Sequence, residues 1–248
     1  MKVFKYHSLV LLATLLLGQT EAGADAAKPV ENSLGMKFVT VPGIRVLFSV
    51  WETRVRDYRA FAEETGRPWP QPDFPQTPDD PVVNVSWEDA DAFCHWLTAR
   101  ERKAGRLTEK QRYRLPTDQE WSVAVGLASD RGHTPEDRLQ NSVVWPWGYT
   151  WPPQSGDGNY ASELAVDKFT NTSPVGSFKP NTFGLFDLGG NAWEWCEDWY
   201  NDARVTKVLR GGSFHDGQPK DLLAAYRFSG TVHLSNDDIG FRIVIAEI

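Results

Sequence analysis

Residues 184–200, which read GLFDLGGNAWEWCEDWY, constrain the fold more than any other part of this chain. The segment holds three glycines, three tryptophans, one asparagine and four carboxylates. Neither the period of a helix nor the alternation of a strand sorts its polar from its apolar positions. We therefore expect neither an ordinary amphipathic helix nor an alternating strand here, and a further constraint must shape this backbone.

The composition predicts one loop-rich α+β domain. The chain has 248 residues, of which 41% are hydrophobic and 12% aromatic, which is enough apolar material for a core. Its 20 glycines, 16 prolines and 11 tryptophans indicate many short elements joined by turns and packed by large rings.

The N-terminus has the pattern of a secretory signal peptide. Two lysines precede an apolar run over residues 9–17, and alanines follow at positions 22, 24 and 26. We predict a signal peptide over residues 1–26 and a single domain over 27–248, in a secreted or periplasmic protein. The run is shorter than the ~20 residues that span a bilayer, so we expect no membrane span after signal removal; an uncleaved anchor is the alternative.

The net charge limits the classes of ligand, and the two cysteines raise the question of a disulfide. The net charge is −7, and the predicted cleavage removes two lysines and two carboxylates, so it stays unchanged. Such an acidic protein is a poor binder of nucleic acid or anionic membrane, which leaves a protein, peptide or glycan as ligand. Cys94 and Cys196 are the only cysteines, and the sequence leaves open whether they form a disulfide or stay as buried thiols.

Patterns in the first half predict a β-hairpin and a helix. Residues 32–48 place apolar side chains on either side of a Pro-Gly turn, as in a hairpin. Thr53 can cap a helix that ends at Gly66. The proline-rich residues 67–82 then predict an extended surface loop.

Two capping boxes predict two more helices. Ser86 with Asp89 begins one of them, and Thr117 with Glu120 begins the other. The first has a buried stripe that includes Cys94. After residue 127 we expect turns and short strands, such as 207–210 and 241–245.

An ordered series of motifs resembles one known family. The motifs are NVSWEDADAFCHWL, YRLPTDQEW, WPWG, GNYA, TSPVGSF, GLFDLGGNAWEW, VLRGGSF and GFRIV. Together they resemble the formylglycine-generating enzyme family, also called the sulfatase-modifying factor domain, over about residues 33–245. The resemblance implies a variant of the C-type lectin fold, supported by bound calcium.

The resemblance also implies two sets of calcium ligands. Calcium prefers oxygen ligands, and glycines allow the backbone to turn its carbonyls inward. The first set would be the side chains of Asp187 and Glu194 with the carbonyls of Gly190 and Ala192. The second would be the side chains of Asn159 and Asp167 with the carbonyls of Tyr160 and Phe169. The alternative is that Asp187 and Glu194 only cap turns beside packed tryptophans.

The family's catalytic cysteines are absent. In active members, two cysteines after the GGS motif bind copper and oxidise a substrate cysteine to formylglycine; here the positions are Asp216 and Asp221. Carboxylates are hard ligands, whereas Cu(I) needs soft thiolates, so copper chemistry is not expected. His215 with these aspartates is a weak candidate for a hard-metal or acid–base site, and a polar surface loop is the favoured interpretation. Three arginines in family motifs are interpreted as structural: Arg210, Arg227 and Arg242.

Three functions are compatible with these features. The leading hypothesis is an exported, non-catalytic, calcium-supported module that binds a ligand or partner. The alternative is an oxidoreductase of the formylglycine-generating type that uses a different site. The third is a lectin-fold display protein whose residues 214–238 form a variable recognition segment.

Overall fold

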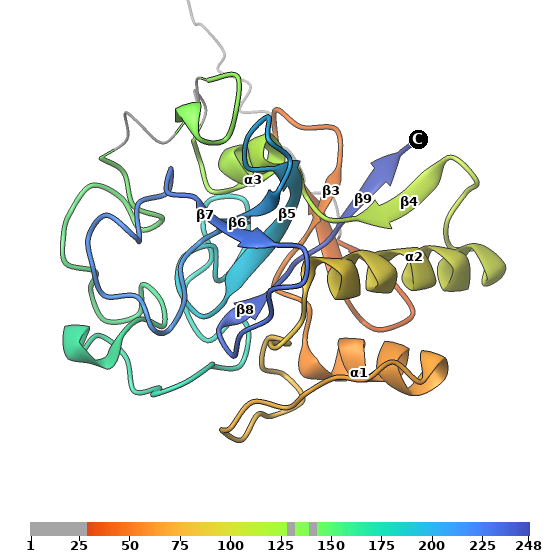
Figure 1. Cartoon of the computed structure of the whole chain (residues 1–248), viewed down its shortest axis with the longest axis horizontal. Coiled ribbons are helices and arrows are strands. Elements are labelled where there is room, and N and C mark those ends of the chain that lie inside the picture. Colours follow the sequence, from red (N-terminus) through yellow and green to blue (C-terminus); the bar gives the residue numbers. More distant parts are fainter. Residues whose placement is uncertain (1–28, 128–131, 139–142) are drawn as a thin grey trace, which may run out of the picture.

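The computed structural model describes residues 29–127, 132–138 and 143–248. In Figure 1 the first two helices and one sheet occupy the right side of the molecule, and the left side consists mostly of loops. The expected mixture of helices, short strands and long irregular segments is therefore confirmed. The predicted signal peptide lies outside the described residues. Within the described ranges, no helix is long and apolar enough to cross a membrane.

Two of the three predicted helix starts are confirmed. Helix α2 (Trp87–Lys103) follows Ser86, whose hydroxyl accepts a hydrogen bond from the Asp89 N–H at 3.2 Å. Helix α3 (Asp118–Ala124) follows Thr117, which accepts one from the Glu120 N–H at 3.1 Å. In both, the acidic side chain accepts a hydrogen bond from the backbone N–H of the capping residue, which completes the capping box.

Helix α1 (Val55–Thr65) begins one residue later than predicted. Its N-cap is Arg54, whose N–H donates to the Asp57 carboxylate at 3.1 Å. Thr53 does not cap the helix: its hydroxyl has no hydrogen-bond partner among the described residues, and its N–H donates to the Phe241 carbonyl at 2.8 Å. Gly66 ends the helix in the left-handed conformation, as predicted.

The first sheet contains the predicted hairpin. Antiparallel pairing joins its five strands in the spatial order β1 (Val30–Glu31), β2 (Lys37–Thr40), β3 (Leu47–Ser49), β9 (Val244–Glu247) and β4 (Gln111–Arg114). The β2–β3 pair is that hairpin. The C-terminal strand was predicted over 241–245, but residues 241–243 are not in a strand. The carbonyls of Phe241 and Ile243 instead accept hydrogen bonds from the backbone of Thr53 and Ser49.

The second sheet contains a strand that the sequence patterns missed. Its order is β7 (Phe228–Thr231), β6 (Thr206–Arg210), β5 (Trp193–Trp199) and β8 (Ile239–Gly240). Strand β5 is the second half of the segment from which we began, and, as expected, it is not an alternating strand. Both sides of β5 are buried over its first four residues, so polar and apolar positions do not alternate there.

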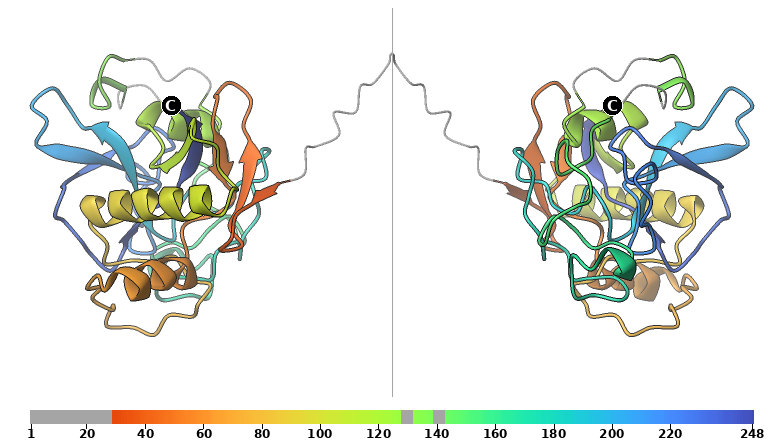
Figure 2. Two further views of the ribbon diagram at one scale, coloured as in Figure 1. Left: turned by 90° about the vertical axis from the view of Figure 1, so that its right-hand side faces the viewer. Right: turned by 90° about the vertical axis from the view of Figure 1, so that its left-hand side faces the viewer.

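Large rings fill the core between the helices and the sheets. Phe61 and Phe93 pack edge to face at 5.8 Å between α1 and α2, which lie side by side in Figure 2. Trp195 and Trp121 are wholly buried beside the second sheet. Cys94 and Cys196 are buried free thiols, so no disulfide joins them.

Candidate functional site

The loop before β5 owes its shape to four residues with positive φ. Gly184, Asp187, Gly190 and Asn191 have φ values of +77°, +56°, +80° and +64°. At Gly190 a Cβ atom would collide with the Asn159 carbonyl oxygen, so only glycine fits. Non-glycine residues with positive φ often mark functional sites, because surrounding contacts must hold the strained backbone. The glycines of the opening segment therefore bring this loop against residue 159.

Glu194 is locked in a buried ion pair. Its two oxygens accept hydrogen bonds from the Arg242 guanidinium at 2.6 and 2.7 Å, and Oε2 also accepts one from the Trp121 indole at 2.8 Å. All three residues are fully buried. A carboxylate has about four acceptor positions, so these bonds leave about one of them for a further ligand. Arg242 is structural, as predicted.

Asp187 has an oxygen with no donor. Its Oδ2 accepts a hydrogen bond from the Gly176 N–H at 2.7 Å, whereas Oδ1 is buried and has no hydrogen-bond partner among the described residues. Burial raises the pKa of this carboxyl to about 6, against the opposing effects of the Gly176 hydrogen bond and the Arg242 charge. The group therefore needs a proton, a cation or a hydrogen-bond donor.

A third carboxylate, Glu52, lies close to the first two. It accepts hydrogen bonds from the Asn191 side chain at 2.8 Å and from the Ala192 N–H at 3.2 Å. Burial, together with the negative charges of Asp187 and Glu194, raises its pKa well above the usual range. Sequence reasoning missed Glu52, because a single glutamate after an apolar run carries no signal of burial.

The second predicted ligand set also comes together. The Asp167 carboxylate accepts hydrogen bonds from the N–H groups of Tyr160 at 3.2 Å and Phe169 at 2.8 Å. The Asn159 amide nitrogen donates to the Asn171 carbonyl at 2.8 Å. Its oxygen, Oδ1, is buried without a hydrogen-bond donor among the described residues. Each of the two sets thus contains one orphaned buried oxygen, on Asn159 and on Asp187.

Asn191 connects the two sets. Its N–H donates to the Asn159 carbonyl at 2.8 Å, and its side-chain oxygen accepts from Asn159 Nδ2 at 3.1 Å. The other end of the same amide donates to Glu52. The sequence analysis did not assign Asn191 a role, although an asparagine after two glycines is a common signal of left-handed backbone.

Asp216 is the residue that the sequence resemblance implies at the position of the first copper-binding cysteine. Its carboxylate accepts hydrogen bonds from the Ser213 N–H and hydroxyl, both at 2.8 Å. The same hydroxyl is 3.1 Å from the Asp238 carboxylate. Burial raises the pKa of both Asp216 and Asp238. A carboxylate thus occupies this position and is held by the turn that follows GGS.

Asp221 lies near Asp216, and its negative charge contributes to the raised pKa of Asp216. His215 turns outward: its side chain is 56% exposed, and Nε2 is 3.7 Å from the Asp237 carboxylate. Across the described ranges, no three His, Cys, Asp or Glu side chains gather as metal ligands. Calcium sites built mainly from carbonyl and amide oxygens do not require such a group.

The other two arginines of the family motifs, Arg210 and Arg227, form buried ion pairs in the core. Arg210 and Arg227 both pair with the buried Asp118 and both contact the Ser122 hydroxyl, at 2.9 and 3.1 Å. Burial opposes ionisation of Asp118, but these arginine charges bring its pKa below the usual value. The structural interpretation of both arginines is confirmed.

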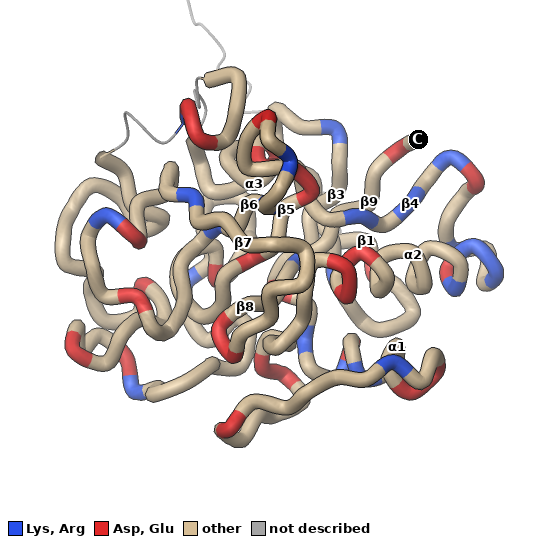
Figure 3. The backbone as a smooth tube through the Cα atoms, viewed as in Figure 1, with Lys and Arg blue, Asp and Glu red and all other residues tan. Residues whose placement is uncertain are grey.

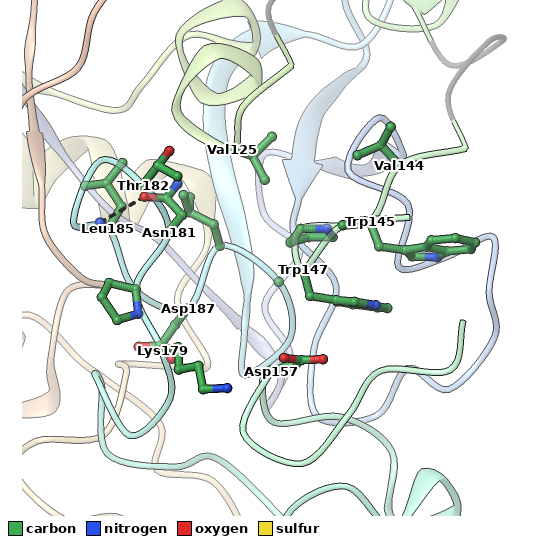
Figure 4. Close-up of a pocket in the computed structure, with 15 residues that line it drawn as sticks. Val125, Val144, Trp145, Trp147, Asp157, Lys179, Asn181, Thr182, Leu185 and Asp187 are labelled. Atoms are coloured by element: carbon green, nitrogen blue, oxygen red, sulfur yellow. Dashed lines mark hydrogen bonds between the residues drawn. The ribbon is translucent and has the colours of Figure 1, made fainter. Parts of the chain in front are cut away.

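A cavity of about 420 Å³ adjoins Asp187. Figure 4 shows it between the turn that carries Trp145 and Trp147 and the loop that carries Lys179 and Asn181. Asp157 lies beside the Trp147 ring. The WPWG motif at residues 145–148 contributed only to the family resemblance, and no sequence pattern predicted this cavity.

Comparisons with known proteins identify the family. The model of the sulfatase-modifying factor enzyme 1-like domain matches residues 19–247. The formylglycine-generating enzyme of Streptomyces coelicolor is 33% identical in an alignment of 201 residues that covers 71% of this chain and 58% of that protein. The Mus musculus protein named inactive C-alpha-formylglycine-generating enzyme 2 is 36% identical in an alignment of 174 residues that covers 65% of this chain and 48% of that protein. The chain thus spans about half of the length of these relatives.

Solved structures share the fold. PvdO from Pseudomonas aeruginosa superposes with a TM-score of 0.66 at 19% identity, covering 90% of this chain and 99% of that one. CarF superposes with a TM-score of 0.60 at 24% identity, covering 82% and 86%. The chain therefore belongs to the family of the sulfatase-modifying factor enzyme 1-like domain, which includes the formylglycine-generating enzymes.

Proposed function

We propose that this chain is an exported, calcium-supported module that binds a ligand or partner and lacks the oxidase chemistry of its family. One observation carries the non-catalytic part of the proposal. The positions of the two copper-binding cysteines hold Asp216 and Asp221, and Asp216 is hydrogen-bonded into the turn after GGS. Oxygen ligands are poor donors for Cu(I), so the redox metal has no soft ligands at this position.

The remaining cysteines do not replace the missing pair. Cys94 and Cys196 are fully buried, and burial raises the pKa of both thiols well above the usual value. A buried neutral thiol is a poor metal ligand, because the thiolate is the species that binds. The mouse relative whose name includes "inactive" is a precedent for family members without the oxidation.

The orphaned oxygens support the calcium part of the proposal. Asn159 Oδ1 and Asp187 Oδ1 are each buried without a donor in the part of the chain that the structure describes, and each belongs to one predicted ligand set. The second set would add the Asp167 side chain and the carbonyls of Tyr160 and Phe169. The first would add the carbonyls of Gly190 and Ala192 and the one acceptor position left on Glu194. Bound calcium would supply positive charge to oxygens that otherwise lack a partner.

The lectin-like character of the fold and the export belong to the same proposal. A C-type lectin-like scaffold would hold long loops on a small core, in agreement with the loop-rich side of Figure 1. Export rests on the N-terminal sequence pattern. Acidic and basic residues are interspersed over the backbone in Figure 3, and the net charge of −7 favours a ligand that is not a polyanion.

Two measurements on the purified mature chain test the proposal. The first incubates it with a cysteine-containing sulfatase peptide, copper and oxygen, and mass spectrometry follows the peptide. The peptide should stay unchanged, while the Streptomyces coelicolor enzyme converts it as the positive control; conversion by this chain refutes the non-catalytic part.

The second measurement determines bound metals and the thermal midpoint with and without chelator. We expect calcium, no copper, and a lower midpoint after chelation, since an ion bound only by the folded state stabilises it. The calcium part of the proposal is refuted if the purified protein contains no calcium and its thermal midpoint is the same with and without chelator.

A further inference from the structure

We infer that the cavity beside the WPWG turn, lined by Trp145, Trp147, Asp157 and Lys179, binds a saccharide ring. This inference rests on the proposed binding function and adds the place and the chemical class of the ligand. The cavity has a volume of about 420 Å³. Cavities that hold small molecules measure about 300–1,000 Å³, so a mono- or disaccharide fits.

The two tryptophans give the cavity a rigid aromatic wall. Their rings are nearly parallel, at 15° with centroids 6.1 Å apart. Each indole N–H is already satisfied: Trp145 donates to the Pro219 carbonyl at 2.8 Å, and Trp147 donates to the Thr150 carbonyl at 2.9 Å. Both side chains are half-buried and line the cavity, and the hydrogen bonds fix the orientation of each ring before a ligand binds.

The cavity has hydrogen-bond donors and acceptors. Lys179, across the cavity from the tryptophans, is exposed and contributes donors, and the half-buried Asp157 beside the Trp147 ring contributes acceptors (Figure 4). Asp187 lines the inner wall of the cavity, but its free oxygen is already assigned to calcium. The groups left for a ligand are the Lys179 donors and the Asp157 acceptors, so the cavity suits a ligand that has both acceptors and donors.

A saccharide matches this combination better than an amine does. Each sugar hydroxyl can donate and accept, and the C–H face of the ring can lie against an indole. An ammonium group can only donate, and it would meet the positive charge of Lys179. The two classes predict opposite effects of Lys179→Ala: removal of the lysine weakens the binding of a sugar and strengthens the binding of an amine.

Saturation-transfer NMR and calorimetry on the full mature chain in calcium test the inference. The probes are glucose, galactose, mannose and N-acetylglucosamine, with lysine amide as the amine probe. We expect at least one sugar to bind, and Trp147→Ala to weaken it about tenfold. Trp69→Ala is the matched control, because Trp69 is also half-buried and donates to a carbonyl, of Val83 at 3.0 Å, but lies outside this cavity.

Three results would overturn the inference. They are no binding of any sugar probe by a folded chain, binding that Trp147→Ala leaves intact, or tighter binding of lysine amide after Lys179→Ala. Thermal midpoints of the variants establish that each one is folded. The peptide oxidation assay is independent of these results: turnover there would refute the proposed function and leave sugar binding to be judged by its own data.

Discussion

Replacement of Asp187 by asparagine should stabilise the calcium-free protein. In the native structure burial raises the pKa of this carboxyl from 3.8 to about 6. A raised pKa means that the folded state holds the proton more tightly than the unfolded state does. This contribution to the free energy of unfolding is full below pH 3.8 and is lost as the pH rises through about 6.

The pKa shift sets the size of the effect. About two pKa units correspond to about 3 kcal/mol of lost stability at pH 7. Asparagine carries no charge and avoids this loss, and the pKa of about 6 already includes the effect of the Gly176 hydrogen bond. The expected gain is about 3 kcal/mol at pH 7, or about 6–12 °C in Tm for a chain of this size.

Urea denaturation and thermal scans with chelator present measure this effect. The gain should vanish at pH 4, where native Asp187 is protonated in the folded state. Calcium should then raise the Tm of the native chain more than that of Asp187→Asn, because the ion attracts the ionised carboxylate. The control is Asp157→Asn, a half-buried carboxylate in the same cavity, which should stay within about 0.5 kcal/mol. If Asp187→Asn is less stable than the native chain at pH 7 without calcium, the argument from buried charge fails.

Three further predictions concern the scaffold. Arg242→Met should lower the free energy of unfolding in urea by about 3–5 kcal/mol, because Glu194 keeps its buried charge and loses its partner; a loss below 1 kcal/mol, on the order of an exposed pair, contradicts the assignment. Gly190→Ala should cost more than Gly184→Ala in the same assay, since both have positive φ but only Gly190 faces the Asn159 carbonyl; equal costs would exclude the close approach. Iodoacetamide at pH 8 should leave Cys94 and Cys196 unmodified until urea is added, as buried neutral thiols react slowly, and mass spectrometry of the native protein would reveal any exception.

Local signals predicted the first half of the fold well. Ser86 and Thr117 each stand three residues before an acidic residue, and this pattern alone located two helices. Such caps need only neighbouring residues, so they are visible in sequence. The pattern missed Arg54 as the cap of the first helix, whose N–H and guanidinium both donate to the Asp57 carboxylate, because arginine is not a typical capping residue. Strand β5 was missed because it is buried on both sides and has no alternation.

Some parts of the candidate site were also predicted from the sequence, and others were not. The resemblance to the family pointed to Asn159 and Asp187, and both have an orphaned buried oxygen in the structure. Glu52 and the WPWG cavity were not predicted. The burial of Glu52 and the position of the two tryptophans opposite Lys179 depend on loops that meet only in three dimensions. Local sequence patterns cannot predict contacts between residues that are distant along the chain.

The claim that carboxylates at positions 216 and 221 prevent this chain from holding the redox metal is tested most directly by a copper(I) titration. The native chain and Asp216→Cys/Asp221→Cys compete for the ion with a coloured copper(I) chelator. We predict that the native chain leaves the copper with the chelator, whereas the double variant removes one equivalent. Stoichiometric copper uptake by the native chain would contradict the account, and so would a folded double variant that takes up none.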